Sequence, residues 1–295
     1  MTSLFITAAA DYVERIHDVA TPTDLKPLVA AAVGTSVRRI GRFIQLALIG
    51  AGRCAKQTQL PTGTAVYLGS GRGDLEVTIE VMQTLLRDGH PPKPLSFINT
   101  VSNAACYYVA QSLKLMSRSS FVCNRYFAFE TVLQLAALDL AGGVVDNALV
   151  GTVDVVVPPL EGHRIRLGLS SDVEVGDATH WLELRTARTA STLGELIACE
   201  QFADRESLAQ WLRENEDWRN ARLATGHFMS EDEASSWSQE LALERFDYRT
   251  GRPYYDSQSG AAINAFVQSA QARLLHVNRD PSGRYAVMLL SKELE

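Results

Sequence analysis

The alternation of short apolar runs with amphipathic stretches constrains this fold more than any other feature of the sequence. In the first half, apolar residues recur at helical spacing between runs that read as strands. The expected strands lie at 4–8, 65–69, 119–123 and 148–157, and the expected helices at 36–52, 75–87, 102–113 and 127–141. A β–α–β–α–β–α–β order is typical of an α/β fold with helices over a sheet.

The second half has a similar style, although the letters show no repeat. The pattern predicts a loop at 158–172, adjacent strands at 180–187 and 193–199, helices at 206–214, 231–244 and 258–273, and a last strand at 284–291. Gly50 and Gly52 are expected to end the helix over 36–52, and Gly142 and Gly143 the helix over 127–141. Two similar halves are therefore consistent with the pattern.

Composition excludes several classes of protein. A net charge of −6 gives no basic excess for phosphates, so nucleic-acid binding is disfavoured. The N-terminal residues lack the basic region of a signal peptide, and no apolar run approaches the roughly 20 residues of a membrane span. The four cysteines are far apart, which argues against zinc or a disulfide framework and favours a reducing cytoplasm.

Most residues with catalytic potential have a sufficient structural interpretation. The turn SGRGD (70–74) lacks the last glycine of a dinucleotide-binding loop, so Asp74 is expected to cap the following helix. Cys106 lies on an apolar helical stripe and is expected in the core, and Glu130 favours the dipole of a helix N-terminus. None of the six histidines has a metal-binding spacing, and His227 is the best catalytic candidate among them, although a surface-loop role is favoured.

Cys123 differs from the other cysteines, because it ends a predicted strand close to a helix N-terminus, where a thiolate is stabilised. The order of several segments resembles the β-ketoacyl synthases of the thiolase fold. The segments are RRIGRFIQLAL (38–48), FINTVSNAACYYVAQSLKL (97–115), FVCNRYFAFETVLQLAALDLAGGVVDNALVGTVD (121–154) and DPSGRYAVMLL (280–290). The resemblance covers most of the first half and is patchy in the second.

The resemblance implies a fold and a place for each catalytic group. It implies one ketosynthase-like domain over 1–295, with two similar βαβαβ halves (about 1–157 and 173–295) in a five-layered α-β-α-β-α core. Counting back from Gly143 and Gly151 places Tyr126 where the family has its nucleophilic cysteine, with Cys123 three residues early. A phenol cannot replace a thiolate as acyl acceptor.

The other catalytic groups of the family are also displaced. Phe127 and Phe129 stand where the family has small residues that admit an acyl chain. The segment YYDSQSGAAINA (254–265) resembles the second histidine motif, and its histidine position falls on Ser257. No HGTGT motif is present, and His227 does not lie in one.

We therefore interpret the chain as a non-catalytic chain length factor, with Tyr126, Phe127 and Phe129 as gate residues. The resemblance implies an active ketosynthase as heterodimer partner, or a homodimer, and an acyl carrier protein. The implied setting is fatty-acid-like or polyketide synthesis, with polyenes among the polyketides considered. No cofactor or metal is expected. Two alternatives stay open: an active ketosynthase or acyltransferase that uses Cys123 or another register, and a stand-alone acyl-binding protein of this fold.

Overall fold

The computed structural model describes residues 3–18 and 22–293, and its nine strands join in the order β3-β2-β4-β5-β1-β6-β9-β8-β7. The strands are β1 (Leu4–Arg15), β2 (Ala65–Ser70), β3 (Ser119–Cys123), β4 (Asn147–Asp154), β5 (Gly176–Arg185), β6 (Gly194–Phe202), β7 (Arg222–Thr225), β8 (Arg273–Arg279) and β9 (Tyr285–Ser291). The helices are α1 (Lys26–Val33), α2 (Arg42–Ala55), α3 (Leu75–Leu86), α4 (Pro94–Asn99), α5 (Ala104–Leu113), α6 (Ala128–Ala141), α7 (Leu160–Leu167), α8 (Arg205–Glu214), α9 (Glu231–Leu241) and α10 (Ser259–Gln268).

The strands form two similar parts joined by a short seam. In the first part, β2 is parallel to β3 and β4, whereas β5 is antiparallel to β4 and β1. In the second, β8 is parallel to β7 and antiparallel to β9, and β9 is antiparallel to β6. Only Leu4, Phe5 and Ile6 of β1 pair with β6, so the sheet is held together there by a few residues.

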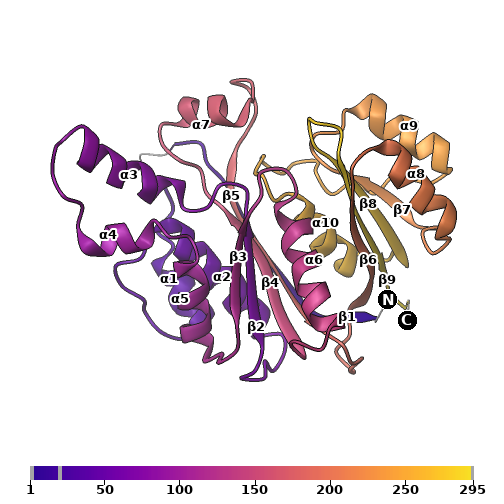
Figure 1. The fold of residues 1–295 in the computed structure, drawn as a ribbon, viewed down its shortest axis with the longest axis horizontal. Helices are drawn as coiled ribbons and strands as arrows, with labels where there is room; N and C mark the ends of the chain where they lie inside the picture. Colours follow the sequence, from indigo (N-terminus) through magenta and orange to yellow (C-terminus); the bar gives the residue numbers. More distant parts are fainter. Residues whose placement is uncertain (1–2, 19–21, 294–295) are drawn as a thin grey trace.

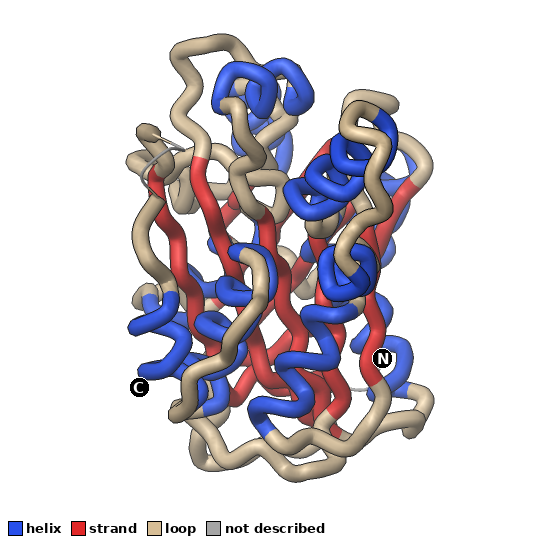
Figure 2. Tube along the Cα trace, turned by 90° about the vertical axis from the view of Figure 1, so that its left-hand side faces the viewer, coloured by secondary structure: helices blue, strands red, loops and turns tan. Residues whose placement is uncertain are grey.

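Helices α6 and α10 lie between the two parts of the sheet (Figure 1). Helix α6 contacts β2 and β4 on one side and β6 and β9 on the other, while α10 contacts β1, β5 and β8. Helix α2 covers the outer face of the first part together with α1 and α5, and α8 and α9 flank the second part. Figure 2 shows the helices on both sides of the strands. These five layers, α-β-α-β-α, confirm the predicted fold class.

The central layer is the apolar core that both halves share. Phe129, Leu133 and Ala136 of α6 pack with Ala262 and Phe266 of α10 against strands of both parts. A separate core under α2 includes Trp181 and Cys106, and Cys106 is buried as expected. Burial raises the pKa of the Cys106 thiol to about 12.

Several elements agree with the sequence-based expectations. Strand β3 spans the predicted residues, α6 begins one residue later than predicted, and the chain leaves α6 through Gly142 and Gly143, with Gly143 at a φ of 66°. The Asp74 carboxylate accepts from the Val77 N–H at the start of α3, which confirms the expected cap.

Other expectations were wrong for reasons of packing. Gly50 and Gly52 do not end a helix: both lie inside α2, where a Cβ on Gly50 would overlap Trp181 and a Cβ on Gly52 would lie 2.8 Å from the Ala32 carbonyl oxygen. The expected loop over 158–172 contains α7. The helix expected from Ser102 begins at Ala104, and the Ser102 hydroxyl accepts from the Asp74 N–H at 2.9 Å.

Three further elements escaped the sequence patterns. Helices α1 and α4 are additional to those predicted, and the helix expected over 258–273 ends at Gln268, so that β8 begins at Arg273. Strands β5 and β6 were expected to be neighbours, but β1 lies between them. Strand β5 therefore pairs with β4 and β1 of the first part.

Candidate functional site

The carboxyl ends of three parallel strands meet at one edge of the sheet and define the candidate site. Ser70 at the end of β2 stands opposite Cys123 at the end of β3, and β4 ends beside them at Asp154. The carboxyl edge of parallel strands is where α/β proteins commonly place their sites.

An Asx turn built by Asn124 shapes the passage from β3 into α6. The Asn124 side-chain carbonyl accepts from the N–H groups of Tyr126 (3.3 Å) and Phe127 (3.4 Å), and its amide donates to Thr131 Oγ1 at 2.9 Å. Phe127 and Phe129 point into the core and are buried, whereas the Tyr126 ring is only half-buried. Of the three predicted gate residues, Tyr126 is therefore the one that borders accessible space.

A stack of rings, here called the aromatic column, connects Tyr126 to the second half. The Tyr126 and Phe228 rings meet edge to face at 5.1 Å, Phe228 meets His227 at 5.4 Å, and His227 lies 4.2 Å from Tyr254. The Arg125 guanidinium lies over the Tyr126 ring, 5.2 Å from its centre. The column thus brings together the predicted Tyr126, the predicted His227 and the loop that carries Ser257.

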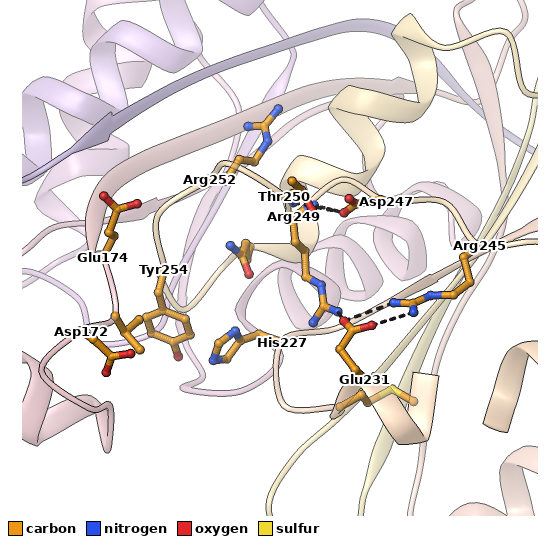
Figure 3. Close-up of a pocket in the computed structure, with 13 residues that line it drawn as sticks. Asp172, Glu174, His227, Glu231, Arg245, Asp247, Arg249, Thr250, Arg252 and Tyr254 are labelled. Carbon is orange, nitrogen blue, oxygen red and sulfur yellow. Dashed lines mark hydrogen bonds and ion pairs between the residues drawn. The ribbon is translucent and has the colours of Figure 1, made fainter. Parts of the chain in front are cut away.

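His227 follows β7 and lines an open cavity of about 910 Å³. Figure 3 shows His227 beside Tyr254, with Glu231 bound by Arg245 and Arg249 farther along the wall. Burial, with a contribution from the Arg249 charge, lowers the pKa of His227 to about 4. The imidazole is therefore neutral at physiological pH and a weak base.

Ser257 is fully buried beside a carboxylate that sequence reasoning missed. Its N–H donates to Asp154 Oδ2 at 2.8 Å, while Ser70 Oγ and the Gly71 N–H donate to Asp154 Oδ1 at 3.1 and 2.9 Å. The Ser257 hydroxyl has no hydrogen-bond partner among the described residues. Within the part of the chain that the structure describes, no imidazole is hydrogen-bonded to this hydroxyl to act as a base.

Asp256 forms a second buried carboxyl next to Asp154. It accepts from Tyr254 Oη at 2.8 Å and from Arg72 Nε at 3.0 Å. Burial first, and then the charge of Asp256, raises the pKa of Asp154 to about 7. The sequence patterns did not mark this pair, because Asp154 lies inside the strand predicted over 148–157 and Asp256 only adjoins Ser257.

Cys123 is exposed at the end of the edge strand β3. Its sulfur lies 3.6 Å from the Gly71 carbonyl oxygen. Partial burial of the sulfur, followed by the charges of Asp154 and Asp256, raises the pKa of the thiol. The thiol is therefore protonated at neutral pH, since Arg72 only partly offsets these effects.

Within residues 3–18 and 22–293, no His, Cys, Asp and Glu side chains gather in a group of three that could hold a metal ion. Among the same residues, no helix has both the length and the apolar character needed to cross a membrane.

The end of β3, the Asn124 turn and the start of α6 (residues 121–130) are called the elbow below. The five layers and this elbow define a thiolase-like fold, as found in ketosynthases. The chain superposes on one chain of a complex described as a type II PKS acyl-carrier protein with its ketosynthase bound to the hexaketide (AntDE:AntF). The TM-score is 0.73 and the identity 14%, over 99% of this chain and 100% of that one. For the ishigamide ketosynthase/chain length factor the TM-score is 0.71 and the identity 15%, over 98% and 99% of the two chains.

The PfaC keto synthase-chain length factor gives a TM-score of 0.72 at 11% identity, over 100% of this chain and 43% of PfaC. At such identities the likeness establishes the fold, and it confirms the resemblance at that level. No protein-family model matches the sequence. No curated protein matches it either.

Proposed function

We propose that this chain is a ketosynthase-like subunit without condensing activity, a chain length factor that pairs with an active β-ketoacyl synthase and shapes its acyl cavity. The observation that carries the proposal is Tyr126 at the start of α6, closed in by Phe228 and the rest of the aromatic column. A phenol in that place offers no acyl acceptor, and the fully buried Ser257 stands at the second-histidine position.

The solved structures of similar fold support the setting of the proposal. Two of them are described as ketosynthase/chain length factor proteins, and a third contains an acyl-carrier protein bound to its ketosynthase. We infer a role in polyketide or fatty-acid-like synthesis, with acyl groups on a carrier protein and a polyene among the possible products. Residues 1–295 would act as one ketosynthase-like unit in the cytoplasm, where four unpaired cysteines remain reduced.

An uncovered surface on the first half supports pairing with a second subunit. Strand β3 is an edge strand whose described pairing is with β2 alone, so its outer hydrogen-bonding groups are available to another strand. Helices α3 and α4, which project from this half in Figure 1, expose a group of large apolar side chains (the α3–α4 apolar patch): Met82, Leu85, Leu86, Leu95, Phe97, Ile98 and Val101. Patches of this kind mark interfaces.

Co-expression with an active ketosynthase, chosen from the same genome, tests the pairing. We expect a stable heterodimer by native mass spectrometry, and a homodimer or poor solubility for the chain alone, because the α3–α4 apolar patch is then exposed to water. A monodisperse monomer in sedimentation that does not bind the ketosynthase would count against the proposal and favour a stand-alone acyl-binding protein.

The substitution Tyr126→Ala tests the gate. Removal of the ring opens space beside Phe228, so the heterodimer is expected to release longer acyl products, measured by mass spectrometry of the carrier-bound chains. Tyr12→Ala is the matched control, because Tyr12 is also half-buried but lies on β1, outside the aromatic column. An unchanged product length in Tyr126→Ala would refute the gate while leaving the pairing intact.

A further inference from the structure

A small polar bridge crosses the apolar central layer close to the elbow. Glu130 in the first turn of α6 is completely buried, and its two carboxylate oxygens accept from different parts of the second half. Asn278 Nδ2 at the end of β8 donates to Oε1 at 2.8 Å, and Ser259 Oγ at the start of α10 donates to Oε2 at 2.9 Å. Glu130, Asn278 and Ser259 are called the polar bridge below.

The polar bridge is connected directly to the backbone of the elbow. Asn278 Nδ2 also donates to the Tyr126 carbonyl oxygen at 3.3 Å, so one amide group binds both the turn and the helix that follows it. The neighbouring Phe127 N–H is held by Asn124. The Tyr126 peptide is thus fixed from two sides, by Asn124 within the turn and by Asn278 from the opposite half.

Asn278 also meets the segment that carries the rest of the aromatic column. A Cβ on Gly226 would overlap the Asn278 side chain, so only glycine lets the chain leave β7 at this point. The next two residues are His227 and Phe228, whose ring packs on Tyr126. Asn278 therefore lies against both segments that supply the contact between Tyr126 and Phe228.

Stability alone does not account for a carboxylate in this place. Burial raises the pKa of Glu130, and the donors given above are an amide and a hydroxyl rather than a cation. Buried polar groups of this kind are often no more stabilising than well-packed apolar residues, but they fix one geometry among several. The geometry fixed here is the position of the Tyr126 elbow relative to β8 and α10 of the second half.

We propose that Asn278 and Glu130 are positioning residues for the gate: their hydrogen bonds hold the Tyr126 elbow against Phe228 and couple it to β8 and α10. This inference rests on the proposed function only where product length is the readout. The position of the elbow itself is measurable in the isolated chain.

Hydrogen exchange of the elbow amides 121–130, followed by mass spectrometry, tests the coupling. In Asn278→Asp a second carboxylate faces Glu130, and the donor to the Tyr126 carbonyl is lost. We expect exchange at the elbow to rise by about tenfold, since two hydrogen bonds of Asn278 are lost and a typical hydrogen bond is worth roughly a factor of two to ten. The double substitution Glu130→Gln with Asn278→Asp exchanges donor and acceptor between positions 130 and 278, and we expect it to restore part of the protection, because the Tyr126 carbonyl still lacks its donor.

Asn264→Asp serves as the matched control. Asn264 is equally buried on α10, but its hydrogen bonds go to the Gly260 carbonyl and towards His180, away from the elbow. It should lower the melting temperature without a selective effect on residues 121–130. If Asn278→Asp does not fold, Asn278→Ala removes the same donors without adding a charge.

Two results would overturn the inference. One is that, in both Asn278 variants, hydrogen exchange at the elbow amides rises no more than exchange in the rest of the chain. The other is a double substitution that remains as exposed as Asn278→Asp. In the heterodimer, the same variants should broaden the distribution of product lengths. Suppose that Tyr126→Ala leaves product length unchanged but the Asn278 variants raise exchange at the elbow as expected. The gate proposal is then wrong, and the positioning role of Asn278 and Glu130 is still supported.

Discussion

At the scale of single residues, the four thiols differ in accessibility and reactivity. Cys54, Cys106 and Cys199 are buried, and Cys123 is exposed. Because burial and the neighbouring Asp154 and Asp256 raise the pKa of Cys123, we expect slow alkylation by iodoacetamide near pH 7, accelerating as the pH rises. Intact-mass measurement should find one labelled site in the folded chain, and none in Cys123→Ala.

Cerulenin, a thiol-directed inhibitor of condensing enzymes, sharpens this prediction. A subunit without condensing activity should bind no stoichiometric cerulenin at neutral pH. Rapid modification at Cys123, together with an acyl-transfer activity that Cys123→Ala abolishes, would instead support the active alternative.

The residue types of the site were only partly predictable. The resemblance to the ketosynthase motifs led to Tyr126 and Ser257. The structure connects Tyr126 through Phe228 and His227 to Tyr254, in the loop that carries Ser257. Phe228, Asp154 and Asn278 went unnoticed, because their importance depends on contacts between the two halves. The approach of Asp256 to Asp154 depends likewise on how the loop before α10 folds over the sheet edge, which no local pattern records.

At the scale of elements, the α3–α4 apolar patch carries a prediction for pairing. Phe97 on α4 is 61% exposed, so Phe97→Glu should leave the melting temperature nearly unchanged while it weakens dimerisation by about 2 kcal/mol, as substitution of a large interface side chain does. Sedimentation velocity across a dilution series measures this. Leu138→Glu on α6 is the control, because Leu138 is 64% exposed but lies outside the patch.

The sequence patterns predicted a helix or strand well where local residue types determine its ends. They predicted it poorly where contacts with distant parts of the chain determine them. Strand β3 and helix α6 were found because an apolar run, a polar turn and a glycine pair mark their ends. Gly50 led to a wrong helix end. Glycine is required there because a Cβ would overlap the Trp181 ring, not because the helix ends at that residue. The insertion of β1 between β5 and β6 depends on strand pairing over long sequence distances. Hydrophobic periodicity within a short window does not report such pairing.

At the scale of the whole molecule, buried titratable groups give opposing pH dependences. The folded-state pKa of Asp154 is raised to about 7, so its contribution to stability is complete below about pH 4 and is lost as the pH rises through 7. Burial lowers the pKa of His180 to about 4 and that of His276 to about 3, so their contributions are lost as the pH falls below about 6.5. The contribution of Asp154 therefore opposes those of the two histidines between about pH 4 and pH 6.5.

The variant Asp154→Asn separates the two components. Between about pH 5 and pH 8, the free energy of unfolding of the wild type should fall relative to the variant by about 2 kcal/mol. Urea unfolding at each pH measures it. Parallel profiles for the two proteins would mean that Asp154 is ionised throughout this range.

The central place of β1 has a consequence for synthesis on the ribosome. This strand is made well before its partners β5 and β6, which begin at Gly176 and Gly194. Until those residues emerge, the apolar residues of β1 have no sheet to join, and the first half cannot close on itself. Long-range pairing of this kind slows folding and leaves nascent chains open to aggregation. The chain is therefore expected to form its sheet only after β5 and β6 have been made, and to depend on chaperones until β1 is paired.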